Sequence, residues 1–224
     1  MARRFVAERR RDPYYRAAQR EGLRSRAAFK LAHLAQRFPI FRRGDRVLDL
    51  GSAPGGWSMV AAEIVGARGE VVAVDPRAFE PIPGVHPIRG RVGDPALGAR
   101  LGPAPFDVLL SDMSPTISGA YATDHARSIT LVRAALGLAR AHLKPGGSFV
   151  AKAFDGDLLP ALDLEAGPLF DRWRHTKPPA SRAASSEIYL IGLGFRGGAG
   201  AGPPGRVPAN FSPGEREARV APAA

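Results

Sequence analysis

Apolar residues gather in short runs along the chain, and most of these runs are separated by segments with helical spacing. Six runs predict strands, the third weaker than the others: residues 46–50, 70–74, 85–89, 106–110, 148–153 and 187–193. The intervening spacing predicts helices at residues 57–65 and 123–143, the second stopped by Lys144-Pro145-Gly146-Gly147, and after residue 153 a helix broken by Pro160 and Pro168. Wholly apolar strands that alternate with helices are typical of a parallel sheet with helices on both faces. The pattern therefore predicts an α/β protein.

The two ends of the chain differ from this alternating middle. Residues 13–37 are predicted to be helical in two pieces separated near Gly22. Apolar residues of the second piece recur on one face, at Ala28, Leu31, Leu34 and Ala35. From residue 196 onward Gly, Pro, Ala and Arg dominate, which is typical of disordered segments. We therefore expect three parts: a helical extension over residues 1–45, an α/β domain over 46–195 and a disordered tail over 196–224.

The charge of the chain is concentrated at its N-terminal end. The formal net charge is +11, and residues 1–46 hold 14 Lys and Arg against 4 Asp and Glu. A basic segment on a nearly neutral body is typical of a protein that binds a polyanion, because neutralised phosphates release counterions. We therefore predict nucleic-acid contact by this segment, and RNA contact by Arg24 and Arg26 in particular. A mitochondrial presequence is the weaker interpretation, because acidic residues occur early and the arginines continue into the predicted helix.

Other features of the composition narrow the class of protein. No apolar run approaches the roughly 18–20 residues that cross a bilayer, and no apolar segment follows the basic start as it does in a secretory signal. Cysteine is absent, which excludes disulfides and thiolate metal sites and fits a reducing compartment. These features predict a cytoplasmic protein without membrane contact.

Glycines lie in the turn after the first predicted strand, in the sequence Gly51-Ser52-Ala53-Pro54-Gly55-Gly56-Trp57. Such a turn at the carboxyl end of a parallel strand lets a ligand approach the backbone, although a plain tight turn is the structural alternative. The spacing fits neither the dinucleotide-binding fingerprint nor the phosphate-binding loop of nucleotide hydrolases. Asp75 follows the second strand, where a carboxylate binds the ribose of a nucleoside cofactor or caps a helix. The two features together are compatible with NAD or with S-adenosylmethionine.

An acid and a lysine occupy positions where a charge is costly. Asp112 closely follows the strand at 106–110, and Lys152 lies inside the apolar run at 148–153. A buried lysine must be paired or lose its proton, and an amine, unlike a guanidinium, can then act as a base. Because only four of the 32 basic residues are lysines, Lys152 is a candidate catalytic base with Asp112 as its partner. A lysine that reaches solvent from the end of its strand is the structural alternative.

Five motifs, in this order and with these gaps, resemble the FtsJ/RrmJ family of ribosomal RNA 2′-O-methyltransferases. The resemblance covers about residues 12–194, and its motifs are residues 22–31, 49–57, 111–119, 144–154 and the stretch 181–189. It implies a Rossmann-like S-adenosylmethionine-dependent methyltransferase fold, with a mostly parallel seven-stranded sheet and helices on both faces. The Lys-Asp-Lys-Glu tetrad of the family falls on Lys30, Asp112, Lys152 and Glu187.

The resemblance also implies a role for each member of the tetrad. Lys152 takes the proton of a ribose 2′-hydroxyl, its neutral form favoured by burial and by the cationic Lys30. Asp112 orients Lys152 and lies near the methyl group that is transferred, while Lys30 and Glu187 hold the ribose. Considered singly, Lys30 is equally well a solvated helix residue and Glu187 a charge at a strand edge. Alignment of the reacting atoms supplies much of the rate.

The cofactor implied by the resemblance is S-adenosylmethionine. The pattern of the family assigns it to the glycine turn, to the acid after the second strand and to the acid near the methyl group: Gly51, Gly55, Gly56, Trp57, Asp75 and Asp112. One position departs from the family, because Arg91 follows Gly90 where an acid commonly meets the adenine amino group. We therefore expect either Asp94, the nearest acid, or backbone groups and apolar contact to hold the adenine.

The expected function is methylation of a ribose 2′-hydroxyl, in a uridine of large-subunit ribosomal RNA, by a monomer. Three alternatives stay open at this point. The same chemistry can act on transfer RNA or another RNA, or the scaffold can bind RNA without catalysis. A small-molecule O-methyltransferase is the weakest alternative, because the basic segment has no use there and the sequence holds no evident cluster of metal ligands.

Overall fold

The computed structural model describes residues 20, 22–179 and 186–197 of the chain. The first piece of the helix predicted at residues 13–37, and all but two residues of the tail predicted at 196–224, lie outside the described residues. Within those residues no helix is both long enough and apolar enough to cross a membrane.

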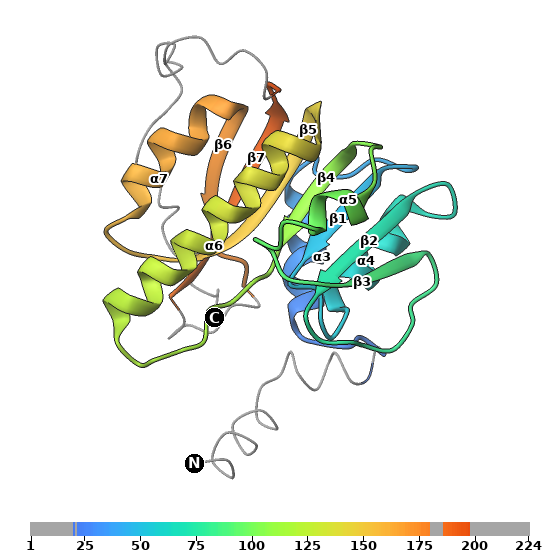
Figure 1. Cartoon of the computed structure of the whole chain (residues 1–224), viewed down its shortest axis with the longest axis horizontal. Coiled ribbons are helices and arrows are strands. Elements are labelled where there is room, and N and C mark those ends of the chain that lie inside the picture. The colour runs from blue at the N-terminus through green and yellow to red at the C-terminus, as the bar shows by residue number, and fades with distance from the viewer. Residues whose placement is uncertain (1–19, 21, 180–185, 198–224) are drawn as a thin grey trace, which may run out of the picture.

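The core of the molecule is one seven-stranded sheet with the strand order β3-β2-β1-β4-β5-β7-β6 (Figure 1). Its strands are β1 (Arg46–Leu50), β2 (Glu70–Asp75), β3 (Val85–Arg89), β4 (Phe106–Ser111), β5 (Leu143–Phe154), β6 (Phe170–Thr176) and β7 (Glu187–Phe195). The strands from β1 to β5 pair in parallel, whereas β7 pairs antiparallel with both of its neighbours. The expectation of a mostly parallel, seven-stranded sheet is confirmed.

Helices cover both faces of this sheet, as the sequence predicted. They are α3 (Ala27–Arg37), α4 (Gly56–Val65), α5 (Leu97–Leu101), α6 (Tyr121–His142) and α7 (Leu159–Ala166), with a short 3₁₀ helix at Gly167–Leu169. One hydrophobic cluster joins the sheet to α5, α6 and α7, and a second joins its other face to α3 and α4. In Figure 1, α6 and α7 lie in front of the sheet, and α3 and α4 lie behind it.

Helix α3 belongs to the core. Its side chains Ala28, Leu31 and Leu34 are fully buried in the cluster that contains Trp57 and Val47. The predicted apolar face of this helix therefore packs on the α/β domain. The helix before residue 46 shares a hydrophobic core with the strands after it. The division of the chain at that residue stays a prediction.

The structure differs from the pattern at four places. Strand β6 was missed because only Phe170 and Trp173 of its seven residues are buried, so its sequence shows no alternation. Helix α5 is only five residues long, too short for a helical period. Pro160 lies in the first turn of α7 instead of breaking it, a position where proline costs no hydrogen bond. The segment from Lys144 to Gly147 is the start of β5, not a loop.

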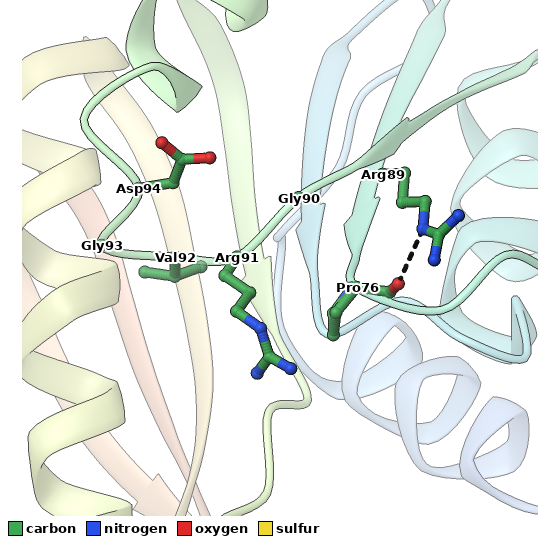
Figure 2. Close-up of a pocket in the computed structure, with 7 residues that line it drawn as sticks. All are labelled: Pro76, Arg89, Gly90, Arg91, Val92, Gly93 and Asp94. Carbon is green, nitrogen blue, oxygen red and sulfur yellow. Dashed lines mark hydrogen bonds between the residues drawn. The ribbon is translucent and has the colours of Figure 1, made fainter.

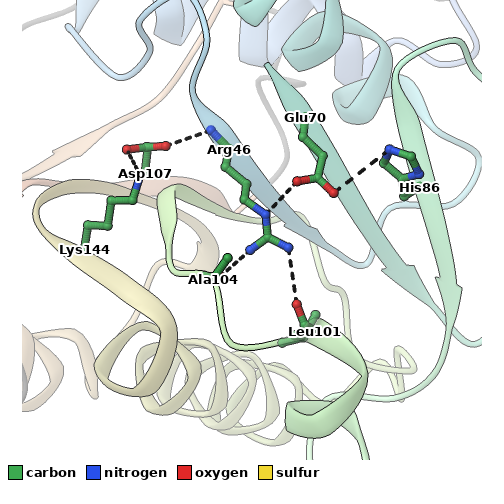
Figure 3. A network of polar contacts seen from close by, with 7 residues as sticks. All are labelled: Arg46, Glu70, His86, Leu101, Ala104, Asp107 and Lys144. Carbon is green, nitrogen blue, oxygen red and sulfur yellow. Dashed lines mark hydrogen bonds and ion pairs between the residues drawn. The ribbon is translucent and has the colours of Figure 1, made fainter. Parts of the chain in front are cut away.

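A polar network ties together the amino ends of four strands (Figure 3). Arg46 on β1 donates to the Glu70 carboxylate on β2 at 2.7 Å, and its backbone N–H donates to Asp107 on β4 at 2.8 Å. Lys144 on β5 donates to the same Asp107 carboxylate at 2.8 Å. The pairing of Leu143 with Phe106 of β4 makes this segment part of a strand, and the network fixes the Lys144 side chain. The network also leaves the opposite, carboxyl edge of the sheet as the place where loops can build a site.

Candidate active site

The glycine turn after β1 is held in place by its neighbours at the carboxyl edge of the sheet. Gly51 has a φ of +74°, and its N–H donates to the carbonyl of Val74 at 2.9 Å. A Cβ atom on Gly51 would lie 2.8–2.9 Å from Met113, including two backbone atoms of that residue. Since Met113 directly follows Asp112, the absence of a side chain at Gly51 allows the β1 turn and the β4 loop to touch.

The N-terminal motif packs on the other side of this turn. A Cβ atom on Gly56 would lie 2.2 Å from the hydroxyl of Ser25, so a side chain there would displace that hydroxyl. Trp57 is buried and donates its indole N–H to the carbonyl of Ala27 at 2.9 Å. The side chain of Trp57 therefore ties α4 to α3.

Asp75, the last residue of β2, is 4% exposed. One oxygen of its carboxylate accepts the N–H of Ala53 in the glycine turn at 3.0 Å, and the other accepts the N–H of Arg77 at 2.8 Å. The oxygen bonded to Arg77 also accepts its guanidinium at 3.2 Å, whereas the oxygen bonded to Ala53 keeps a second lone pair with which it can accept a ligand hydroxyl. The carboxylate thus links the turn to β2 and can still accept a ribose hydroxyl, the role predicted for it.

A cavity of about 660 Å³ opens beside this turn (Figure 2). Its lining comes from the carboxyl ends of β2 and β3 and from the loop that follows β3: Pro76, Arg89, Gly90, Arg91, Val92, Gly93 and Asp94. In Figure 2 the side chains of Arg91 and Asp94 point in opposite directions from that loop. One Asp94 oxygen accepts the N–H of Ala96 at 2.9 Å, so this carboxylate also caps the turn before α5.

The four residues predicted as a tetrad meet as two ion pairs. Lys152 Nζ lies 2.9 Å from a carboxylate oxygen of Asp112 and donates to the backbone carbonyl of the same residue at 2.9 Å. Lys30 Nζ donates to a carboxylate oxygen of Glu187 at 2.5 Å. Both lysines are buried, at 4% and 8% exposure. The interpretation of Lys30 as a solvated helix residue does not fit this burial.

The two ion pairs lie close enough to influence one another. Burial alone raises the pKa of Glu187, but the charge and hydrogen bond of Lys30 outweigh it, with further help from Lys152 and Arg26. The pKa of Glu187 is therefore held below its usual range, and its carboxylate stays charged beside both lysines. The site is a compact arrangement of two amines and two carboxylates.

Tyr189 lies among these four residues and was given no role by the sequence. It pairs with Lys152 across β5 and β7, and Lys30 Nζ lies 5.5 Å from the centre of its ring. Burial raises the pKa of the Tyr189 hydroxyl well above its usual range, and the Asp112 and Glu187 carboxylates raise it further. The phenol therefore keeps its proton as a donor. The signal for it was its position two residues after Glu187, which places both on one face of a strand.

Asp49 on β1 is fully buried under the glycine turn. One of its oxygens accepts the hydroxyl of Ser58 at 2.6 Å. Burial raises the pKa of Asp49 to about 7 against this hydrogen bond, and the charges of Asp112 and Asp75 add to the rise. A carboxyl group thus keeps its proton in the folded chain at a pH where it ionises in the unfolded chain.

We expect an Asp49→Asn variant to change how stability depends on pH. The unfolded chain loses the Asp49 proton near pH 3.8 and the folded chain near pH 7, so stability falls as the pH rises through this window. The loss reaches a few kcal/mol, at about 1.4 kcal/mol per pH unit. Urea unfolding at pH 5 and pH 8 should therefore show a larger gain for the variant at pH 8. An equal difference at both pH values would contradict the raised pKa.

These features together define a class of protein. A seven-stranded sheet with one reversed strand, a glycine turn after β1 and an acid ending β2 make a Rossmann-like methyltransferase. A family model described as FtsJ-like methyltransferase matches residues 23–195. The chain belongs to this family, which confirms the resemblance found in the sequence.

Relatives and solved structures agree with this family. The chain is 47% identical over 195 residues to "Ribosomal RNA large subunit methyltransferase E" of Paramagnetospirillum magneticum, covering 83% of this chain and 80% of that one. It is 46% identical to the protein of the same name from Archaeoglobus fulgidus, covering 84% and 97% of the two chains. A crystal structure described as a ribosomal RNA methyltransferase of Plasmodium falciparum has a TM-score of 0.70 at 27% identity, covering 78% and 99% of the two chains.

Proposed function

We propose that this methyltransferase transfers a methyl group from S-adenosylmethionine to a ribose 2′-hydroxyl, in a uridine of large-subunit ribosomal RNA. The observation that carries the proposal is the pair of buried ion pairs that joins Lys152 to Asp112 and Lys30 to Glu187 at the carboxyl edge of the sheet. The relatives that share more than 40% identity carry the name of a ribosomal RNA large subunit methyltransferase. A monomer acting in the cytoplasm fits this role.

The residues around the glycine turn fit the proposed cofactor. The hydroxyl of Ser52 is buried and finds no hydrogen-bond partner in the described part of the chain, so it is available to a polar ligand. One oxygen of Asp75 has a lone pair for a ribose hydroxyl, and the cavity at Arg91 and Asp94 has room for a base. Bound S-adenosylmethionine supplies a methyl group already activated by a sulfonium.

Lys152 is the proposed base. A ribose hydroxyl is a poor nucleophile at neutral pH, and a positioned base that accepts its proton supplies about 10²–10⁴-fold in rate. The amine of Lys152 is fixed by an ion pair with the Asp112 carboxylate and by a hydrogen bond that it donates to the Asp112 carbonyl, so that its Nζ can receive the proton at one place. Because the methyl donor is already activated, the rest of the rate comes from the alignment of the ribose oxygen with the methyl carbon.

Lys30 and Glu187 are proposed to position the ribose. The Glu187 carboxylate accepts a hydrogen bond from Lys30, and a carboxylate is the type of group that accepts a sugar hydroxyl. Lys30 in turn holds the Glu187 carboxylate in place and keeps it charged. The ammonium group of Lys30 also lies over the ring of Tyr189, 5.5 Å from its centre.

Mass spectrometry of ribosomal RNA from a strain that lacks this protein tests the proposal. We expect one 2′-O-methylated uridine of the large-subunit RNA to lose its methyl group and to regain it when purified protein and S-adenosylmethionine are added. Loss of a methyl group from transfer RNA would favour the alternative substrate. RNA binding without any methyl transfer would favour a non-catalytic role.

Arg24 and Arg26, both predicted to bind RNA, have different surroundings. Arg26 lies within electrostatic reach of Glu187, beside the proposed ribose site, and we propose that it contacts the RNA backbone. The guanidinium of Arg24 donates to the carbonyls of Glu80 and Pro81 in the loop after β2, and more weakly to that of Pro54 in the glycine turn. Its donors are therefore engaged with the loop after β2 and with the glycine turn.

We expect an Arg24→Ala variant to bind S-adenosylmethionine about 10-fold more weakly, because two charge-assisted hydrogen bonds that hold the loop are lost. Calorimetric titration with the cofactor measures this change. The salt dependence of RNA binding should stay as in the natural chain, whereas Arg26→Ala should flatten it. If Arg24→Ala flattens the salt dependence and leaves cofactor affinity intact, Arg24 is a phosphate contact as the sequence suggested.

A further inference from the structure

Two large apolar side chains stand in solvent beside the active site. Among the described residues, large apolar side chains are exposed at four positions: Ile117, Tyr121, Leu158 and Leu164. Ile117 and Tyr121 are each 60% exposed. Ile117 lies in the loop between β4 and α6, and Tyr121 is the first residue of α6. This loop begins at Asp112 and runs along the carboxyl edge of the sheet to the start of α6 (Figure 1). Exposed apolar groups next to a site mark contact with a ligand or partner.

The loop that carries Ile117 is held in a fixed shape. Asp124 in the first turn of α6 is buried and accepts the backbone N–H groups of Ser118 at 2.8 Å and Gly119 at 3.0 Å. These hydrogen bonds, that of Ser118 first, hold the pKa of Asp124 below its usual range. Arg127 on the next turn of the helix donates to the carbonyl of Thr116 at 3.3 Å. Ile117 is therefore exposed on a braced loop.

Tyr121 is fixed relative to the catalytic strands. Its hydroxyl donates to the backbone carbonyl of Asp155, which follows the end of β5 and lies three residues after Lys152. The N–H of the same residue donates to the carbonyl of Ser186, directly before Glu187, at 2.7 Å. One hydrogen-bonded chain thus connects the Tyr121 ring to the end of β5 and the start of β7, the strands that supply Lys152 and Glu187.

The Tyr121 ring is also supported from behind. It stacks on the ring of His125 with centroids 6.2 Å apart and planes 12° apart. His125 is buried, accepts the N–H of Leu158 at Nε2 and bonds to the carbonyl of Phe154 through Nδ1, both at 3.0 Å. An aromatic ring that is both exposed and immobilised in this way loses little further entropy when it binds a flat ligand.

We propose that Ile117 and Tyr121 form a platform on which an unstacked RNA base rests beside the methylated ribose. The inference rests on the proposed function. It assigns a binding place to the base of the nucleotide, the part of the substrate that the tetrad does not contact. The nucleotide whose 2′-hydroxyl reaches Lys152 carries a base that lies near the same edge of the sheet, and an unstacked base there needs a surface to rest on. Exposed bases of single-stranded RNA are held by stacking on aromatic rings and apolar side chains. Arg127 beside the platform suits the phosphates of such a strand.

The test compares Tyr121→Ala and Ile117→Ala with the natural chain in methyl transfer to ribosomal RNA. Loss of one stacking side chain costs about 1–3 kcal/mol, so the Tyr121 variant should raise KM for RNA by roughly 5- to 150-fold. The affinity for S-adenosylmethionine should not change. Tyr121→Trp, which keeps a ring, should restore most of the KM. Leu164→Ala is the matched control, because Leu164 is equally exposed but lies on α7, and it should behave as the natural chain.

RNA substrates with an abasic ribose separate stacking from other causes. When the base that rests on the platform is removed, in a series of abasic positions at and next to the target, Tyr121→Ala should no longer matter. The proposed platform is contradicted if Tyr121→Ala raises KM equally for every abasic substrate, or if it leaves KM unchanged on intact RNA. Either result leaves the proposed function intact. If the natural chain methylates no RNA at all, the proposed function itself fails. Binding of a protein partner that is lost in both alanine variants, with KM for RNA unchanged, would make this surface a protein interface.

Discussion

A Lys152→Ala variant is expected to lower kcat for methyl transfer by about 10²–10⁴-fold, the contribution of a positioned base. Its affinity for S-adenosylmethionine should stay the same, because Lys152 contacts Asp112 and not the glycine turn. Single-turnover methylation measures the first effect, and calorimetric titration measures the second. The unfolding free energy should also fall, because the Asp112 carboxylate loses the partner of a largely buried ion pair.

Two further variants test whether Lys152 acts as a base or only through its charge. Lys152→Arg keeps the positive charge but cannot give up a proton near neutral pH, so it should be as inactive as the alanine variant. Lys144→Ala changes a lysine at the other end of the same strand, in the network with Asp107, and should keep the natural kcat. Near-normal kcat in Lys152→Arg would mean that Lys152 acts through its charge and not as a base.

A Gly51→Ala variant is expected to lose both stability and cofactor binding. Its positive φ costs about 1–2 kcal/mol for a residue with a side chain, and a clash inside packed structure adds about 1–3 kcal/mol. The new Cβ would meet backbone atoms of Met113, which cannot rotate away, so the β4 loop must move and take Asp112 with it. We therefore expect the midpoint of thermal unfolding to fall and methyl transfer to be lost together.

Gly102→Ala is a matched control for this variant. Gly102 has a φ of +76°, nearly that of Gly51, but a Cβ there would meet nothing within 4 Å. It should therefore lose only the cost of the backbone conformation and keep its activity. Equal losses in the two variants would show that conformation alone, and not the contact with Met113, requires the glycine in the turn.

The sequence predicted the central strands of the sheet better than the strands near its edge. Strands β1, β2 and β4 are buried on both faces, so each is a continuous apolar run that periodicity detects. Strand β6 escaped because it lies at the edge of the sheet and mixes buried aromatics with exposed Arg172 and Arg174. The reversed direction of β7 was not readable either, because an apolar run looks the same in both directions.

The candidate site was predictable in its parts but not in its contacts. Lys152 stood out as a charge in an apolar strand, and Asp112 as an acid at a strand end. No local pattern announces that Lys30 is buried, because its partner Glu187 lies 157 residues away along the chain. The bonds of Arg24 to the loop after β2 were hidden for the same reason, since backbone acceptors leave no trace in a sequence.

The position of β7 has a consequence for the order in which activity arises during synthesis. This strand is the last of the seven to be translated, yet it occupies an interior place in the sheet, between β5 and β6. Until it emerges from the ribosome, β6 has no partner to pair with and Lys30 has no Glu187 to neutralise it. A growing chain thus already carries its glycine turn, its base and the acid beside it, but it cannot modify its target before the final strand is inserted.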